Sequence, residues 1–204
     1  MKAVRGCEIK LDSMIAPHIQ KQSDAEIKKG VARTDDQRLF HICEALRRGI
    51  MTIEEIHDIT TMDVFFLHKF QNIIDMEKEL AAADKIDSDL YIRAKKMGFL
   101  DKTIEQLSGK DISDVKRLPV YKMVDTCAAE FEAETPYYYS TYDDETEVAP
   151  PSGKKKILVL GSGPIRIGQG IEFDYCSVHC VWTLKKHGCE AILVNNNPET
   201  VSTD

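Results

Sequence analysis

Apolar residues recur at helical intervals from Ser23 to Arg117, and this spacing predicts a succession of short helices. The longest predicted helix runs from Met62 to Ala83. Three hydroxyl residues stand three positions before Glu or Gln, as in a capping box that starts a helix: Ser23, Thr34 and Thr52. Four glycines stand where a helix end would place a left-handed residue: Gly30, Gly49, Gly98 and Gly109. The first part of the chain is therefore expected to be mostly α-helical.

A weak internal repeat lies within this helical region, at an offset of 51 residues. Thr52-Ile53-Glu54 matches Thr103-Ile104-Glu105, and Asp63-Val64 matches Asp114-Val115. The match predicts two related helical hairpins, each with a short helix, a turn and a second helix. Chance similarity is the alternative, because only a few positions agree.

The pattern changes after Leu118. Val120–Val124 and the tyrosine-rich run Tyr137–Tyr142 have extended character, although packing of the tyrosines against neighbouring helices is the simpler interpretation of that run. Acids, paired prolines and three lysines from Asp143 to Lys156 form a solvated connector, which predicts a domain boundary.

The last part of the chain has the pattern of a strand, a glycine turn, a helix and a second strand. The strands are predicted at Lys156–Leu160 and Ala191–Val194, and the helix from Glu172 to His187. A parallel βαβ unit needs further strands beside it and helices on its faces. The fold class expected is a mostly α-helical domain followed by a truncated α/β unit.

Composition limits the function classes. The chain carries 34 acids and 27 bases, a net charge of −7, which disfavours nonspecific binding to nucleic acid. The helical region from Thr34 to Arg117 has 13 bases and 17 acids, a net of −4, which argues against a helix-turn-helix DNA binder. No apolar stretch approaches the ~20 residues that span a bilayer, and no signal peptide is expected. The six scattered cysteines favour reduced thiols in a cytoplasmic protein.

The glycine turn fits no standard nucleotide motif. Gly161 and Gly163 permit positive φ and close approach of the backbone, at the edge of the sheet where ligands of such folds bind. The dinucleotide pattern requires a third glycine where this chain has Arg166, and an acid where it has Asn195. The phosphate-binding G-x-x-x-x-G-K-[ST] pattern is also missing. A free-standing nucleotide-binding regulatory domain with a helical partner domain is the alternative function.

Two groups of side chains near this turn are candidate sites. A metal site is one interpretation of five residues in and after the helix: Cys176, His179, Cys180, His187 and Cys189. The helix offers at most three ligands without awkward loops, so thiols packed against the sheet are the preferred interpretation and no metal is expected. Arg166, Glu172 and Asp174 form a charged group that either lines a polar passage or caps the helix start.

Long motifs in the chain resemble the carbamoyl-phosphate synthase large-chain family. LVLGSGPIRIGQGIEFDYC (158–176) followed by VNNNPETVSTD (194–204) resembles the start of the second synthetase half, and PVYKMVDTCAAEFEAETPYYYSTY (119–142) resembles the segment before it. EALRRG (44–49) and TIEEIHDIT (52–60) resemble the helical oligomerization domain of that family. The resemblance covers nearly the whole chain, least distinctively before about Thr34.

The resemblance implies a domain plan. Residues 1–7 would be the tail of the first ATP-grasp half, 8–151 the helical oligomerization domain, and 154–204 the N-terminal part of the second, Rossmann-like pre-ATP-grasp domain. The family makes carbamoyl phosphate from bicarbonate, ammonia from glutamine and two ATP, for pyrimidine and arginine synthesis. Its ATP and Mg²⁺ would bind outside this segment, so the segment alone is expected to be inactive, with no catalytic or cofactor-binding residue.

The resemblance also implies partners and a site. Other large chains and a small glutaminase subunit would be the partners, with no nucleic acid and no membrane. The family passes an unstable carbamate through an internal tunnel. By resemblance, four residues of the loop would line it: Arg166, Gly168, Gly170 and Glu172. Enclosure excludes hydrolytic water, and glycines leave room for a passage.

Overall fold

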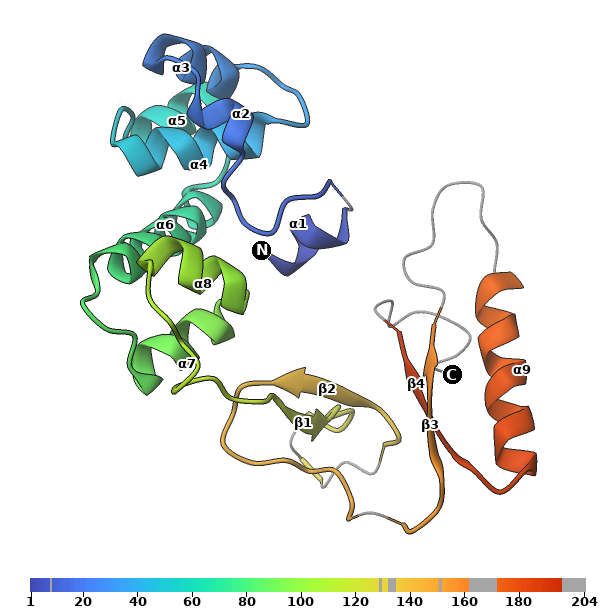
Figure 1. The fold of residues 1–204 in the computed structure, drawn as a ribbon. Coiled ribbons are helices and arrows are strands. Elements are labelled where there is room, and N and C mark those ends of the chain that lie inside the picture. Colours follow the sequence, from blue (N-terminus) through green and yellow to red (C-terminus); the bar gives the residue numbers. More distant parts are fainter. Residues whose placement is uncertain (8, 129, 132–134, 151, 162–171, 196–204) are drawn as a thin grey trace. The chain divides into compact units, whose positions relative to one another are not determined.

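The computed structural model describes residues 1–7, 9–128, 130–131, 135–150, 152–161 and 172–195. The chain divides into two compact units, Met1–Pro119 and Val120–Asp204. The first unit is helical, and the second contains short strands and one helix among its described residues (Figure 1). The expected combination of a helical part and a small βαβ unit is confirmed.

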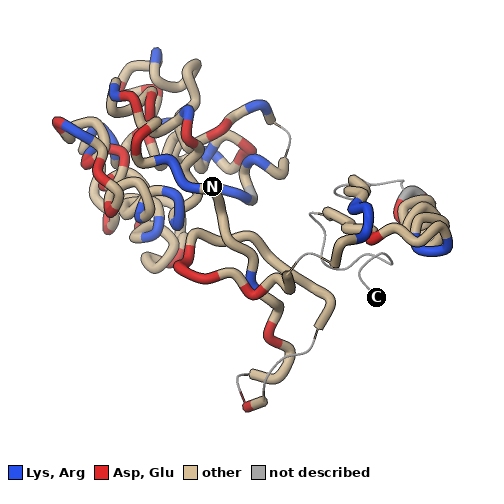
Figure 2. Tube along the Cα trace, turned by 60° about the horizontal axis from the view of Figure 1, so that its bottom comes forward, with Lys and Arg blue, Asp and Glu red and all other residues tan. Residues whose placement is uncertain are grey.

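Short helices follow one another along the first unit, as the periodicity predicts. Their bounds are α1 (Lys2–Gly6), α2 (Pro17–Gln20), α3 (Asp24–Ala32), α4 (Arg38–Arg48), α5 (Ile53–Thr60), α6 (Val64–Ala82), α7 (Ser88–Lys96) and α8 (Asp101–Ser108). Ser23 and Thr52 form complete capping boxes with Glu26 and Glu55. Acidic and basic residues are intermingled along these helices (Figure 2). No helix in the described parts of the chain is long and apolar enough to cross a membrane.

Some predicted helix boundaries were wrong. Thr34 caps no helix: α4 starts later, at Arg38, and the carboxylate of Asp35 accepts from the Gln37 amide instead. Gly49 and Gly109 end their helices in the left-handed conformation as predicted, and Gly98 also has a positive φ. Gly30 does not, because it lies inside α3 against the ring of His41.

The prediction of two related helical hairpins is also wrong, because the second hairpin is not formed. Thr52 precedes α5 as its N-cap, whereas Thr103 lies within α8, whose N-cap is Leu100. A long helix, α6, follows α5, but only a turn follows α8 between Gly109 and Pro119. The sequence match therefore does not reflect two structurally equivalent hairpins.

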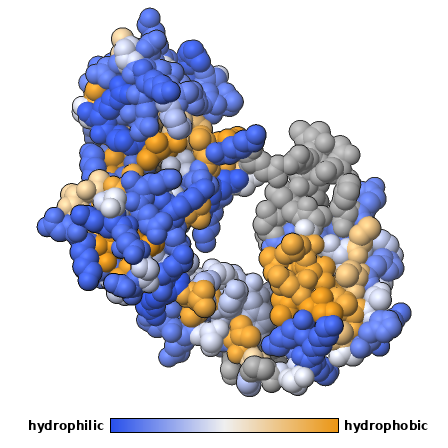
Figure 3. All heavy atoms as spheres, in the orientation of Figure 1, coloured by the Kyte–Doolittle hydropathy of each residue, from blue (hydrophilic) through white to orange (hydrophobic). Residues whose placement is uncertain are grey.

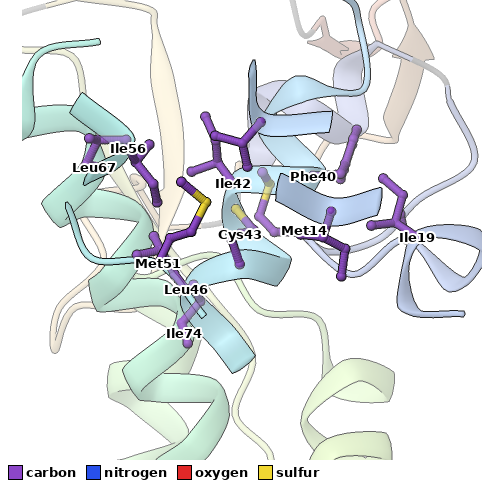
Figure 4. Packing of buried hydrophobic residues seen from close by; sticks show 14 residues of the cluster. Met14, Ile19, Phe40, Ile42, Cys43, Leu46, Met51, Ile56, Leu67 and Ile74 are labelled. Atoms are coloured by element: carbon purple, nitrogen blue, oxygen red, sulfur yellow. The ribbon is translucent and has the colours of Figure 1, made fainter. Parts of the chain in front are cut away.

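Two apolar clusters form the core of the helical unit. The first is centred on α4, whose Ile42 and Cys43 are fully buried, and Figure 4 shows its side chains interleaved between α4 and the neighbouring elements. The second surrounds Tyr91 and Phe99, between the end of α6 and helices α7 and α8. Burial raises the pKa of the Cys43 thiol to about 12, so Cys43 is protonated and unreactive at neutral pH.

A buried ionic group, here named the Arg47 cluster, links α4 to α6. Arg47 Nε donates to Glu77 Oε2 at 2.8 Å, and its Nη1 donates to Glu44. The Glu44 and Glu77 side chains are only 6% and 4% exposed. Glu77 Oε1 is buried without a hydrogen-bond partner among the described residues. Burial alone would lower the pKa of Arg47, but hydrogen bonds and charge from both carboxylates raise it overall.

The second unit contains two small sheets. Strands β1 (Val120–Met123) and β2 (Tyr138–Thr141) pair antiparallel, which confirms the extended character predicted there. The tyrosines of β2 do not pack under helices as the simpler interpretation had it, because Tyr138 and Tyr139 are 42% and 48% exposed. Glu147 and Thr146 bond to the β1 backbone and extend this small structure.

Strands β3 (Lys156–Leu160) and β4 (Glu190–Val194) form a parallel pair, with α9 (Glu172–Lys186) against one face. These bounds confirm the predicted strand, helix and strand. Val159 is buried on the helix side, whereas four apolar residues of the opposite face are 42–75% exposed: Leu158, Leu160, Ile192 and Val194. Figure 3 shows apolar atoms gathered over these strands. The sheet thus has one covered and one open face.

Candidate site at the carboxyl edge of the parallel sheet

The ends of β3 and β4 lie side by side at the carboxyl edge of the sheet. Leu160 is in register with Val194, and the Gly161 amide extends the pairing by donating to the Val194 carbonyl at 2.8 Å. Gly161 and Asn195 are therefore neighbours at this edge, where parallel α/β folds bind their ligands.

The side chain of Asn195 crosses from this edge to the start of α9. Its Nδ2 donates to Asp174 Oδ1 at 3.2 Å, and Asp174 is only 2% exposed. A buried carboxylate requires hydrogen bonds to offset its lost hydration. The Asp174–Asn195 pair therefore joins the first turn of α9 to the end of β4.

Gly161 makes room for this pair. A Cβ at Gly161 would lie 2.8 Å from Asn195 Cγ and 3.0 Å from the Val194 carbonyl oxygen. The close approach that a glycine permits is used at Gly161 by the Asn195 side chain. Gly161 does not adopt the positive φ that a glycine also permits.

The four predicted tunnel residues are only partly described by the structure. Glu172 is the first residue of α9, and its side chain is exposed. Arg166, Gly168 and Gly170 lie outside the described residues. Asp174, which was predicted to belong to a charged group with Arg166 and Glu172, faces the sheet and pairs with Asn195.

The cysteines of α9 do not pack against the sheet, so that prediction was wrong. Cys176 and Cys180 are both exposed, whereas Asp174 and Ser177 of the same helix are buried. The ring of His179 lies between two aromatic rings, 4.4 Å from Tyr175 and 5.2 Å from Trp182 between centroids. No group of three or more potential metal ligands occurs among the residues that the structure describes.

The Asp174–Asn195 pair is not predicted by the sequence. In the sequence, Asn195 stands out only as a departure from the dinucleotide pattern, and Asp174 only as a charge near the helix start. The sequence carries no local signal for it, because the burial of Asp174 and Ser177 on one face of α9 is seen only in the structure. An acid on that face needs a polar partner at the sheet edge.

A second candidate site is an apolar surface on the helical unit, here named the Phe65 patch. It consists of Ile59, Val64, Phe65 and Phe66, which are 41–57% exposed. The two phenyl rings meet edge to face at 5.4 Å, and Lys69 Nζ lies 4.9 Å from the Phe65 ring centroid. Met51, which lies between α4 and α5, does not contribute to this patch, because it is 7% exposed and belongs to the core.

Comparisons with known proteins agree with this order of units. Residues 1–122 match the family model described as carbamoyl-phosphate synthetase large chain, oligomerisation domain. Residues 153–204 match the carbamoyl phosphate synthase preATP-grasp domain. The fold and the matches together define a helical oligomerisation domain joined to a preATP-grasp segment.

Two curated relatives support the same family. The chain is 53% identical over 212 residues to the carbamoyl phosphate synthase large chain of Lachnoclostridium phytofermentans, and 51% identical over 211 residues to that of Agathobacter rectalis. Each alignment covers 100% of this chain and 20% of the relative, so the chain spans about a fifth of the length of these curated relatives. The chain belongs to the carbamoyl-phosphate synthetase large-chain family.

Proposed function

We propose that this chain is the central segment of the large subunit of a glutamine-hydrolysing carbamoyl-phosphate synthase. The observation that carries the proposal is the order of the two matches, an oligomerisation domain at 1–122 and a preATP-grasp domain at 153–204. The proposed enzyme is an ATP-dependent ligase of the cytoplasm. It converts bicarbonate, ammonia from glutamine and two ATP into carbamoyl phosphate for pyrimidine and arginine synthesis.

Within that enzyme, residues 1–7 are proposed as the tail of the first ATP-grasp half and 8–151 as the oligomerization domain. Residues 154–204 are proposed to begin a Rossmann-like pre-ATP-grasp domain, which the parallel β3–α9–β4 unit supports. ATP and Mg²⁺ are assigned to polypeptide outside this segment.

The segment's contribution to the reaction is proposed to be a wall of the carbamate tunnel. Carbamate decomposes in water, so the second phosphorylation depends on carrying it between active sites in an enclosed passage. Arg166, Gly168, Gly170 and Glu172 remain the proposed lining residues. The place of Glu172 at the first turn of α9, beside the carboxyl edge of the sheet, supports this assignment.

The first test compares two polypeptides. The full-length large subunit, assembled with its glutaminase, is expected to form one carbamoyl phosphate for every two ATP hydrolysed. The 204-residue segment alone is expected to form none, because it contains no ATP-grasp fold. Incorporation of radiolabelled bicarbonate measures the carbamoyl phosphate formed, and a separate assay measures the ATP hydrolysed. Product formation by the segment alone, or a full-length subunit that makes no carbamoyl phosphate, would contradict the proposal.

We further infer that the helical unit associates with a second copy through the Phe65 patch. Exposed acids of α5, Glu55 and Asp58, come before most of the patch in the sequence, and the base Lys69 of α6 follows it and lies over the Phe65 ring. In a two-fold symmetric contact each surface meets itself, so Lys69 of one copy can approach the acids of the other. Burial of four apolar side chains supplies the driving force.

Replacing both Phe65 and Phe66 by serine is expected to weaken self-association about tenfold or more, since buried aromatic residues dominate such contacts. Sedimentation velocity over a range of concentrations measures the dissociation constant. Leu118→Ser is the matched control, because Leu118 is a 90% exposed apolar residue outside the patch. Unchanged association of the double variant would show that the contact lies elsewhere.

A further inference from the structure

The antiparallel sheet of the second unit has one covered edge and one open edge. Beside β1, the Glu147 amide donates to the Tyr121 carbonyl at 2.8 Å, and the Glu147 carboxylate accepts from the Met123 amide at 2.7 Å. On the other side, β2 pairs with β1 and with no further strand in the described parts of the chain (Figure 1). The outer edge of β2 is therefore the edge at which another strand can be added.

The backbone of β2 presents hydrogen-bonding groups to this outer edge. The Val124 amide donates to the Tyr137 carbonyl at 2.9 Å, which marks Tyr137 as a residue whose backbone faces β1. Backbone groups alternate in direction along an antiparallel strand, so those of Tyr139 also face β1, whereas those of Tyr138 and Ser140 face outward. β2 contains no proline and no charged residue, which in many proteins block strand addition.

Exposed tyrosines flank this edge on both faces of the sheet. Tyr138 and Tyr139 are 42% and 48% exposed, and successive residues of a strand point to opposite faces. A strand added beside β2 would therefore have an aromatic ring next to it on each face. Tyrosine rings provide contact area at low entropic cost and attract the cations of arginine and lysine.

The charge of this region indicates which kind of segment fits. Residues 120–147 contain eight acids and one base, a net charge of −7, whereas the rest of the chain contains 26 acids and 26 bases. The one base, Lys122, lies 3.9 Å from Glu147. Asp144 and Glu145 follow β2 closely, are exposed, and form no ion pair with another described residue. A basic segment complements this surface, and an acidic one is repelled.

We propose that the outer edge of β2 binds an extended, arginine- or lysine-rich segment of a partner protein, which pairs with β2 as a third strand. The backbone of Tyr138 and Ser140 supplies hydrogen bonds, the tyrosine rings contact the side chains of the segment, and the acids complement its charge. This contact is separate from the Phe65 patch, which belongs to the helical unit. It is also independent of the proposed catalytic reaction.

Three dye-labelled peptides test the proposal, each titrated with the 204-residue chain at low ionic strength and followed by fluorescence anisotropy. A peptide of alternating arginine and valine is expected to bind at least tenfold more tightly than its counterpart with glutamate in place of arginine. The third peptide keeps the arginines but carries N-methyl groups on its backbone amides. It is expected to bind at least tenfold more weakly than the first, because it cannot donate to the edge of β2.

Ser140→Pro tests the edge itself. The Ser140 amide faces outward, so proline removes a donor to an added strand without removing a hydrogen bond between β1 and β2. The variant is expected to bind the arginine peptide at least tenfold more weakly and to keep the far-ultraviolet circular dichroism spectrum of the parent.

A second variant alters charge and keeps every backbone group. Asp144→Asn/Glu145→Gln is expected to weaken binding of the arginine peptide about threefold or more. Its matched control, Glu105→Gln/Asp114→Asn, removes the same charge from exposed positions of the helical unit. The control is expected to bind the peptide as the parent does.

Four results would overturn the inference. Absence of binding would remove the site, and equal binding of the methylated and unmethylated peptides would show attraction by charge alone. Binding to the 204-residue chain but not to the full-length large subunit would make another part of the large chain the occupant. Loss of self-association in Ser140→Pro would make a second copy the occupant. Binding by both proteins that is lost on methylation and in Ser140→Pro supports the inference.

Discussion

Replacing Arg47 by methionine is expected to lower the free energy of unfolding of the helical unit by about 3–5 kcal/mol. The substitution removes the cation that pairs with the almost fully buried Glu77, whereas Glu44 keeps its ion pair with Arg48 at 2.8 Å. Removing one partner from a buried ionic group lowers the free energy of unfolding strongly. The loss is far larger than the stability that the intact group provides relative to well-packed apolar side chains. Because the pKa of Arg47 is raised on folding, its contribution is complete at neutral pH and is lost only in strong alkali.

Denaturant unfolding followed by far-ultraviolet circular dichroism measures this effect. The single tryptophan, Trp182, lies in α9, so its fluorescence reports separately on the second unit. Arg93→Met is the matched control, because Arg93 also joins two carboxylates, Glu79 and Asp89, but at the surface. A loss below about 1 kcal/mol is expected there. Equal losses in the two variants would show that burial is not the cause.

Gly30→Ala is expected to destabilise the helical unit by about 1–3 kcal/mol, although alanine is the better helix former. The added Cβ would lie 2.2 Å from Cδ2 of His41, which is 5% exposed. The His41 ring cannot move aside freely, because Nδ1 lies 3.0 Å from the Gln37 carbonyl oxygen and Nε2 lies 3.0 Å from Gln22 Oε1. Helices α3 and α4 must therefore separate, or both contacts must break.

Gly6→Ala is the control, because Gly6 is also helical and a Cβ there meets nothing within 4 Å. This variant is expected to keep the stability of the parent or to gain up to about 1 kcal/mol from helix propensity. The same unfolding measurement serves both variants. A neutral or stabilising Gly30→Ala would mean that His41 moves away freely and that contact with its ring does not explain the glycine.

Local patterns predicted most of the secondary structure. Residues three to five positions apart form the capping boxes at Ser23 and Thr52 and the left-handed helix ends at Gly49 and Gly109. The geometry of these features therefore follows from their spacing in the sequence. The prediction at Thr34 was wrong. The spacing of Thr34 and Gln37 fits a capping box, but the chain forms a turn at Asp35 and α4 begins at Arg38. Spacing permits a cap without requiring one.

The sites were less predictable. Cys176 and Cys180 fit an apolar helix face by sequence, yet they are exposed, because the side of α9 that meets the sheet carries Asp174 and Ser177. Phe66 and Leu67 are adjacent apolar residues of α6, but Leu67 is fully buried and Phe66 is 57% exposed. One-residue differences in helix phase decide such cases, and a short amphipathic pattern does not define the phase that closely.

By itself, the sequence determined the family, the order of helices and strands, and the acidic charge, since these depend on residue identity and on contacts between near neighbours. Only the tertiary structure decided that Gly30 serves His41, that Arg47 holds two buried carboxylates, and that Asn195 reaches Asp174 over Gly161. Apart from the Arg47–Glu44 contact within α4, these contacts join residues 11 to 34 positions apart on different elements. Their distances follow from how helices and strands pack, and packing geometry is not encoded in any local spacing.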